Sequence, residues 1–173
     1  MDVRVRVGEF RVDNEIRNAV ERVLCSGRVS EGKETREFEA SFARYIGTRH
    51  AVAVNSGTSA LIAGLTAFNA RAKGKPRKKN GVITSPLTYV ATANSIVLAD
   101  MKPIFVDVDP DTFTMLPGEA EDALGKDDSE GIGMILPVHL MGYVCDMDHL
   151  KRLASDHGLI LFEDSSQAHG SIY

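Results

Sequence analysis

Apolar residues recur at every third or fourth position in the first part of the chain. This spacing predicts two amphipathic helices, because one helical turn takes 3.6 residues. We expect the first helix to follow Asp13 as its N-cap and to end at residues 26–27. The second should run from about Thr35 to Gly47. Its apolar face carries aromatic residues that we expect to be buried in a core, namely Phe38, Phe42 and Tyr45.

Short apolar runs, each followed by a turn or by small polar residues, predict the strands of a sheet. They occupy residues 50–55, 81–85, 102–109, 132–138 and 159–162. Helical patterns separate these runs, which indicates an α/β fold with a mostly parallel sheet flanked by helices. The last run has four consecutive apolar residues and predicts a strand that is buried on both faces. Residues 1–7 alternate apolar and charged positions, as an exposed strand or arm does.

Two helices of this second part have recognisable ends in the sequence. Thr88 is a candidate N-cap for the helix that follows the strand at 81–85, and Asp146 is one for a later helix that ends at Gly158. That later helix should bury Leu150 and Leu153.

Composition and charge exclude several classes of protein. The chain has 173 residues, of which 43% are hydrophobic and 25% charged, as expected for one ordinary globular domain. Its net charge of −4 gives no argument for nucleic-acid binding, and the basic stretch 71–79 is interpreted as a solvated connector. No apolar run reaches membrane-spanning length. Cys25 and Cys145 have no metal-binding or redox spacing, which favours a reducing, cytoplasmic location.

Polar residues with chemical potential follow several of the predicted strands. Asp164, Gln167 and His169 come directly after the run at 159–162. The loops at the carboxyl ends of parallel strands form the ligand crevice of an α/β sheet, so these residues are candidates for a site. The alternative is a helix N-cap, in which Asp164 or Ser165 accepts hydrogen bonds from free backbone N–H groups.

A second candidate site follows the run at 50–55. Residues 56–61 combine a glycine with hydroxyl residues at a predicted helix start, where free N–H groups and the helix dipole attract anions. Plain helix capping explains the same residues. The spacing of a Walker motif is absent, which argues against a nucleotide hydrolase. Tyr89 should lie at the mouth of the sheet, where it could stack on a flat ring or pack on its own helix.

These phrases together resemble those of the DegT/StrS-type aminotransferases. Residues 163–170 (Glu-Asp-Ser-Ser-Gln-Ala-His-Gly) are similar to the cofactor strand of that family, and residues 86–92 are similar to its Pro-x-Thr-aromatic-x-Ala-Thr phrase. Residues 137–142 are similar to its Pro-Val-His-Leu-x-Gly phrase, in which His139 would shape the wall of the site. The resemblance implies the large domain of an aspartate-aminotransferase-like enzyme of fold type I, which uses pyridoxal 5′-phosphate (PLP). Residues 1–173 would be the N-terminal part of that domain.

The resemblance also implies roles for individual residues. Asp164 would face the pyridine nitrogen of PLP and keep it protonated, so that the ring can act as an electron sink. Gln167 would lie by the phenolic oxygen, and Tyr89 would stack on the ring. The phosphate would be held by three consecutive residues of the turn, Gly57, Thr58 and Ser59.

The implied reaction transfers an amino group from glutamate or glutamine to a keto group on a nucleotide-linked sugar, in a homodimer. In the family, the lysine that binds the cofactor covalently and a small C-terminal domain come tens of residues after the position of Asp164. The sequence printed here stops at Tyr173, so no catalytic residue is assigned within it. Two alternatives remain open: a catalytically silent remnant that acts by binding a partner, and a sugar dehydratase of the same superfamily, in which a histidine replaces the lysine.

The 173-residue chain is therefore predicted to show no amino transfer on its own, because it lacks the amine that holds the cofactor and moves the proton. A visible absorbance titration with PLP, followed by borohydride trapping and peptide mapping, checks this. We expect only slow, scattered labelling of surface lysines. One stoichiometric PLP adduct at a single lysine, together with amino transfer to a keto-sugar nucleotide, would overturn the prediction.

Overall fold

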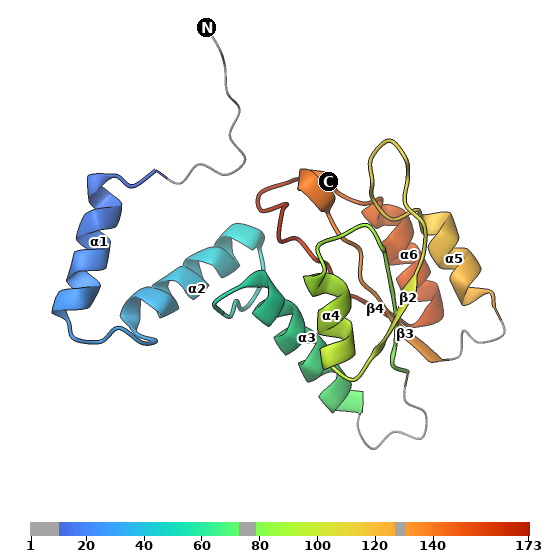
Figure 1. Ribbon diagram of the computed structural model, residues 1–173, viewed down its shortest axis with the longest axis horizontal. Helices are drawn as coiled ribbons and strands as arrows, with labels where there is room; N and C mark the ends of the chain where they lie inside the picture. Colours follow the sequence, from blue (N-terminus) through green and yellow to red (C-terminus); the bar gives the residue numbers. More distant parts are fainter. Residues whose placement is uncertain (1–10, 73–78, 127–130) are drawn as a thin grey trace, which may run out of the picture. The chain divides into compact units, whose positions relative to one another are not determined.

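The computed structural model describes residues 11–72, 79–126 and 131–173 (Figure 1). The chain divides into two compact units, Met1–Ala53 and Val54–Tyr173, which are described separately below. The predicted arm at 1–7 and most of the basic stretch 71–79 lie outside the described residues. Within the described ranges, no helix is both long and apolar enough to cross a membrane.

The described part of the first unit contains two helices, and their ends follow ordinary capping chemistry. Helix α1 spans Asn14–Cys25, and the Asp13 side chain accepts a hydrogen bond of 2.9 Å from the backbone N–H of Ile16, as predicted. Helix α2 spans Lys33–Ile46, so it begins two residues earlier than the sequence indicated. It ends at Gly47, whose φ of +79° is a left-handed conformation that glycine adopts without strain.

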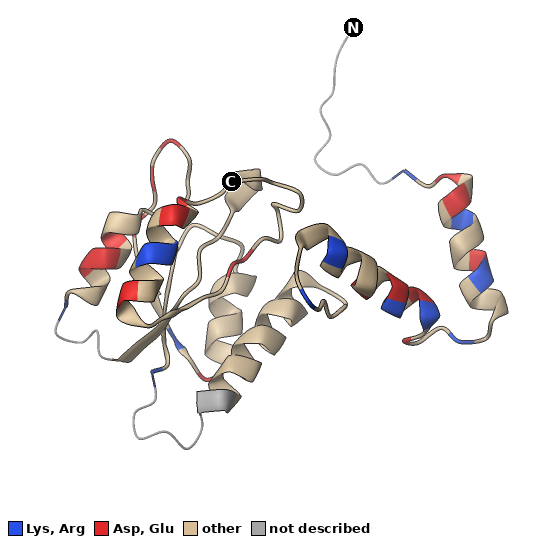
Figure 2. Ribbon diagram, turned by 180° about the vertical axis from the view of Figure 1, so that it is seen from behind, with Lys and Arg blue, Asp and Glu red and all other residues tan. Residues whose placement is uncertain are grey.

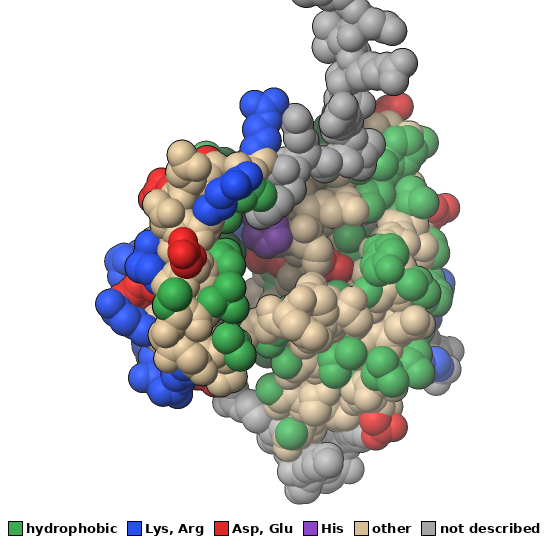
Figure 3. Space-filling view, turned by 60° about the vertical axis from the view of Figure 1, so that its left-hand side comes forward, with side chains coloured by type: hydrophobic (Ala, Val, Ile, Leu, Met, Phe, Trp, Pro, Cys, Tyr) green, Lys and Arg blue, Asp and Glu red, His purple; other side chains and the backbone are tan. Residues whose placement is uncertain are grey.

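The expectation that the aromatic face of α2 is buried is wrong within this unit. The Phe38 side chain is 56% exposed and that of Tyr45 is 69% exposed, and α1 buries none of its residues. Phe42 contacts both neighbouring rings, with centroids 5.6 Å from Phe38 and 6.4 Å from Tyr45. Figure 3 shows hydrophobic side chains of this unit open at the surface beside charged ones. Two amphipathic helices alone do not provide enough apolar surface to bury the apolar face of each helix.

The predicted strand at 50–55 is also not formed. These residues lie outside helices and strands, and the backbone N–H of Ala53 donates a 2.8 Å hydrogen bond to the Glu39 side chain of α2. An apolar run becomes a strand only when a neighbouring strand pairs with its backbone groups. No such neighbour is present among the residues that the structure describes.

The second unit is built on a four-stranded parallel sheet, which confirms the predicted α/β class. Strands β1 (Gly81–Thr84), β2 (Lys102–Phe105), β3 (Ile132–Ile135) and β4 (Ile160–Leu161) are ordered β2-β1-β3-β4. Each strand is shorter than the apolar run that predicted it. β1 and β3 are central and fully buried, as continuous apolar strands in a parallel sheet should be.

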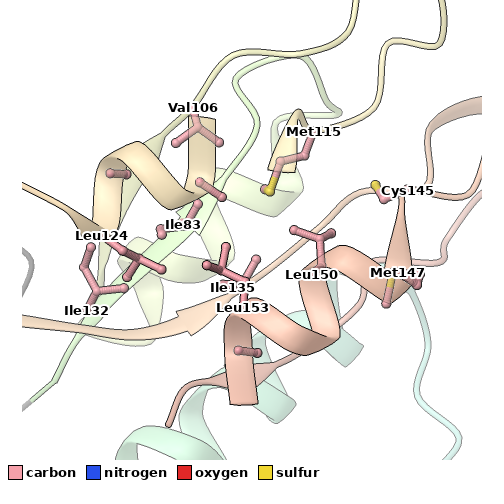
Figure 4. Packing of buried hydrophobic residues seen from close by; sticks show 13 residues of the cluster. Ile83, Val106, Met115, Leu124, Ile132, Ile135, Cys145, Met147, Leu150 and Leu153 are labelled. Carbon is pink, nitrogen blue, oxygen red and sulfur yellow. The ribbon is translucent and has the colours of Figure 1, made fainter. Parts of the chain in front are cut away.

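Helices cover both faces of this sheet, and the buried side chains form one cluster on each face. Helices α5 (Pro117–Leu124) and α6 (Met147–His157) pack on one face with Ile83 and Ile135 (Figure 4). The next residues back along each strand, Val82 and Met134, point to the other face and join the cluster of α3 (Gly57–Ala72) and α4 (Ala91–Leu98). This alternation produces a three-layer unit with the sheet in the middle.

Local turn chemistry sets the ends of the helices in this unit. The Asp146 side chain accepts from the N–H of His149 and caps α6, which ends at Gly158 in a left-handed conformation, both as predicted. Thr88 is not the N-cap of its helix. Helix α4 begins at Ala91, and the Thr88 hydroxyl bonds the hydroxyl of Thr92 instead.

Strand β4 forms an edge of the described sheet. The prediction that it is buried on both faces is wrong, since Ile160 is 45% exposed.

Charged side chains are distributed unevenly over the second unit. Figure 2 shows Lys, Arg, Asp and Glu on α5 and α6, whereas α4 and residues 57–70 of α3 carry none.

The close approach of α3 to β4 requires glycine at position 64. A Cβ atom built on Gly64 would lie 2.4 Å from Cζ of Phe162, a ring that packs in the cluster of α3 and α4. Gly64→Ala is therefore expected to lower the free energy of unfolding by about 1–3 kcal/mol. Gly118→Ala in α5 is the matched control, because nothing lies within 4 Å of its Cβ position.

In the same urea titration, the control should be neutral or stabilising by about 0.5–1 kcal/mol, as expected for glycine in a helix. When Phe162→Leu is added to Gly64→Ala, part of the lost free energy of unfolding should be recovered, because the clashing ring is removed. Equal stabilities of the two glycine variants would show that the α3–β4 contact is not as close as described.

Candidate active site at the carboxyl edge of the sheet

The loops that follow β1, β3 and β4 meet the first turn of α3 around a cavity of about 200 Å³. Parallel strands bring their carboxyl ends to one edge, which is why segments so distant in the sequence share this cavity. This volume is smaller than that of common ligand pockets, which have about 300 Å³ or more. Of the six residues for which the resemblance implies a cofactor contact, five line it: Gly57, Thr58, Tyr89, Asp164 and Gln167.

A buried carboxylate lies in this wall. Asp164 is 6% exposed, and its oxygens accept three hydrogen bonds. Oδ2 accepts from the Thr92 hydroxyl at 2.8 Å, and Oδ1 accepts from the hydroxyl and the backbone N–H of Ser166 at 2.7 and 3.2 Å. No lysine or arginine forms an ion pair with Asp164 within the described part of the chain. The negative charge is thus held by neutral donors and lies at the cavity.

Backbone pairing fixes the position of Asp164. It forms an isolated parallel bridge with Val138, in which its N–H donates to Pro137 O at 2.9 Å and its C=O accepts from the N–H of His139 at 3.1 Å. This bridge continues the β3–β4 pairing beyond the last regular strand residues. Asp164 is therefore located by the sheet and not by a flexible loop.

The first turn of α3 offers free donors to the same cavity. The Ser56 hydroxyl accepts from the N–H of Ser59 at 3.1 Å and so caps the helix. Among the described residues, the N–H groups of Gly57 and Thr58 have no acceptor, as is usual for a first helical turn. The Ser59 hydroxyl donates to the Asn55 side chain at 2.7 Å, so Ser59 lies beside the cavity and does not line it.

Tyr89 and Gln167 both line the cavity. The Tyr89 side chain is 70% exposed, and Oε1 of Gln167 accepts a hydrogen bond of 2.8 Å from the backbone N–H of Met141. That contact leaves the amide NH₂ group of Gln167 as the end that can donate to a ligand. Met141 itself has a φ of +54°, which is unusual for a residue with a side chain.

The wall is completed by the buried histidine of the loop after β3. Nδ1 of His139 accepts from the N–H of Cys145 at 3.2 Å, so Nε2 carries the proton and donates it to Oε2 of Glu163 at 3.0 Å. This hydrogen bond holds the pKa of Glu163 below its ordinary value. His139 is committed at both nitrogens and stiffens the wall. Within the described residues, no cluster of His, Cys, Asp and Glu could hold a metal ion.

Two residues that hold Asp164 were not among the sequence-predicted site residues. Thr92 lies four residues after Thr88, the spacing of neighbours on one helical face, although Thr88 itself precedes the start of α4. Ser166 lies two residues after Asp164, the spacing of an Asx turn. Both spacings are visible in the sequence, but they are common in turns and helix starts, so only the structure distinguishes their role.

Comparison with protein families gives a match to the DegT/DnrJ/EryC1/StrS aminotransferase family over residues 11–173. The chain belongs to this family. The enzymes of the family use pyridoxal phosphate, and a solved relative, NtdA of Bacillus subtilis, contains the cofactor as PMP. NtdA is 31% identical, with a TM-score of 0.78 over 92% of this chain and 35% of its own.

Several members of the family are closely similar in sequence. The spore coat polysaccharide biosynthesis protein SpsC of Bacillus subtilis is 40% identical over 89% of this chain and 37% of its own length. GDP-perosamine synthase of Caulobacter vibrioides is 35% identical over 98% of this chain and 43% of its own length. The present chain thus spans about two fifths of the curated relatives that it matches.

Solved structures confirm the fold-type expectation. DesV of S. venezuelae is 38% identical with a TM-score of 0.78 over 90% of this chain and 39% of its own. A GDP-4-keto-6-deoxymannose-3-dehydratase has a TM-score of 0.86 over 98% of this chain and 43% of its own, but at 24% identity this likeness shows the fold alone.

The residues of the cavity fit a pyridoxal cofactor. A pyridinium nitrogen needs a carboxylate that is not already neutralised, and a phosphate needs free N–H donors. Asp164 and the first turn of α3 supply these two groups on the walls of one cavity.

Gly57 allows the side chain of Ser166 to reach Asp164. A Cβ atom at position 57 would lie 2.8 Å from Oγ of Ser166, the hydroxyl that donates to Oδ1. Gly57→Ala is expected to lower the free energy of unfolding by about 1–3 kcal/mol, and Ser166→Ala by about 1 kcal/mol. In the double variant the clash disappears, so the loss should be smaller than the sum. Additivity to within about 0.5 kcal/mol in urea unfolding would contradict this.

Proposed function

We propose that this chain is the cofactor-binding part of a PLP-dependent aminotransferase that acts on a nucleotide-linked keto-sugar, with glutamate or glutamine as the amino donor. One observation carries the proposal: Asp164, a buried carboxylate that has no cationic partner among the described residues, lines the same cavity as the free N–H groups at the start of α3. The family match supports the reaction class. One relative is named for a GDP-linked product and another for polysaccharide biosynthesis, which supports the substrate class.

Each cavity residue has a task in this proposal. The N–H groups of Gly57 and Thr58 hold the cofactor phosphate, and Ser59 supports that turn through Asn55. Tyr89 covers one face of the ring, and Gln167 donates from its amide to the phenolic oxygen. When bound, the cofactor supplies the electron sink for the reaction. Asp164 stabilises the proton on the ring nitrogen, because the buried carboxylate acts there with little screening by water.

The complete enzyme is proposed to be a homodimer. Large apolar side chains remain exposed in the loops after β1 and β3, the loops that also contribute residues to the cavity. They are Leu87, Tyr89, Val90, Met141 and Tyr143. Exposed apolar residues grouped at one place are typical of a surface that another protein segment covers. A second subunit at this mouth would also exclude water from the cofactor.

The carboxylate assignment is tested by Asp164→Asn in a protein that carries this chain together with the C-terminal portion present in its relatives. The asparagine keeps the size of the side chain but lacks the charge that stabilises the ring proton. Transfer of the amino group from glutamate to a nucleotide-linked keto-sugar should fall by about 10²–10³-fold, as for loss of one preorganised electrostatic group. Asp156→Asn, on the exposed surface of α6, is the control and should retain full activity.

Turnover by Asp164→Asn at the wild-type rate would show that Asp164 is not the carboxylate that stabilises the ring proton. Loss of water from the sugar without amino transfer would instead assign the protein to the dehydratases of the superfamily. A wild-type protein that neither binds pyridoxal phosphate nor acts on the sugar would favour the silent, partner-binding alternative.

A further inference from the structure

Three hydroxyl side chains form a connected hydrogen-bonded system around Asp164. The Thr88 and Thr92 hydroxyls are 2.8 Å apart, Thr92 Oγ1 is 2.8 Å from Oδ2, and Ser166 Oγ is 2.7 Å from Oδ1. All three side chains line the cavity, and Thr92 is almost completely buried, at 1% exposed. The aspartate is thus held from both sides, by the start of α4 and by its own loop.

The direction of each hydrogen bond follows from proton counting. An ionised carboxylate can only accept, so Thr92 must donate its single hydroxyl proton to Oδ2. Thr92 then has no proton left for Thr88, and Thr88 must be the donor in the bond between them. The result is a one-way chain, Thr88 to Thr92 to Asp164, in which each bond polarises the next.

The same counting distinguishes the two carboxylate oxygens. Each oxygen has about two acceptor positions. Oδ1 fills both, with the hydroxyl and the N–H of Ser166. Oδ2 accepts only from Thr92 among the described residues and keeps one acceptor position. Oδ2 is therefore the oxygen available to a ligand in the cavity.

We propose that Thr92 and Ser166 are positioning residues that present Oδ2 of Asp164 to the pyridine nitrogen of the cofactor, with Thr88 supporting Thr92. This inference rests on the proposed function, because it assumes that the cavity takes a pyridoxal phosphate ring. Ser166 saturates Oδ1 and sets one end of the carboxylate. Thr92 shares Oδ2 with the ring nitrogen and fixes the position of that oxygen. When the Thr92 hydroxyl is lost, the carboxylate is free to rotate about Oδ1, which Ser166 holds.

The two possible consequences of removing the Thr92 hydroxyl have opposite signs. If Thr92 positions Oδ2, its loss weakens the contact with the ring, and the ring nitrogen gives up its proton at lower pH. If Thr92 only neutralises part of the charge, its loss leaves Oδ2 a stronger acceptor, and the ring nitrogen keeps its proton to higher pH. The direction of the shift therefore separates positioning from simple charge donation.

The test uses the 173-residue chain and pyridoxamine 5′-phosphate labelled with ¹⁵N in the ring. This probe has an amine in place of the aldehyde, so it needs no lysine to bind. The ¹⁵N chemical shift, followed over a pH titration, gives the midpoint at which the bound ring nitrogen loses its proton. For Thr92→Val we expect the midpoint to fall by about one pH unit, with about tenfold weaker binding. Thr92→Ser should restore both, and Thr88→Val should shift the midpoint less, in the same direction.

Thr84→Val is the matched control for losing a buried hydroxyl. Thr84 is fully buried in β1 and donates a 2.9 Å hydrogen bond to Leu136 O, away from the cavity. Thr84→Val should be less stable than the wild type in urea unfolding. It should keep the wild-type pH midpoint for loss of the proton from the bound ring nitrogen. Equal behaviour of Thr84→Val and Thr92→Val towards the probe, or a midpoint raised by Thr92→Val, overturns the proposal.

Asp164→Asn separates this inference from the proposed function. If it lowers the midpoint while Thr92→Val leaves it unchanged, the cofactor assignment stands and the positioning role is wrong. If the wild-type chain does not bind the probe, or if Asp164→Asn leaves the midpoint unchanged, the cofactor assignment fails and the positioning role fails with it.

Discussion

The backbone bridge between Val138 and Asp164 is the constraint on which the site depends. It extends the β3–β4 pairing past the regular strands, so the loop after β4 leaves the sheet at a fixed place. With that place fixed, the Asp164 side chain meets the start of α4 through Thr92 and approaches the first turn of α3 through Ser166 and Gly57. A loop without this pairing would not hold a carboxylate to the precision that cofactor chemistry requires.

Glycine and the alternation of strand residues make this arrangement compatible with a packed core. Val82 and Met134 point towards α3 and α4, and Ile83 and Ile135 point towards α5 and α6. Gly64 lets α3 lie against Phe162, which directly follows β4 and precedes Asp164 by two residues. The packing of α3 on the sheet and the place of its N-terminal N–H groups are therefore linked, since a helix that moved away from Phe162 would also move away from the cavity.

Local features were predictable from the sequence, and features that depend on pairing or packing with other segments were not. The caps at Asp13 and Asp146 and the helix end at Gly158 follow from the chemistry of single turns. The strand at 50–55 and the burial of Phe38 depend on surfaces that the described residues do not provide, so the apolar pattern alone gave the wrong answer. The gathering of Asp164 and Tyr89 at one cavity followed from the rule for parallel sheets, because each comes after a strand of the sheet. The hydrogen bonds of Thr92 and Ser166 to Asp164 could be identified only from the structure, because Thr and Ser at such spacings are common in turns and helix starts.

The choice of neutral donors around Asp164 has a physical reason. Burying a carboxylate costs several kcal/mol unless hydrogen bonds compensate, and a lysine or arginine would compensate most strongly. A cation would, however, neutralise the charge on which a protonated ring nitrogen depends. Two hydroxyls and one backbone N–H compensate for part of the burial and leave the full negative charge in place. They also leave one acceptor position on Oδ2, so the buried carboxylate is stabilised in the fold and can still accept a hydrogen bond from a cationic ring.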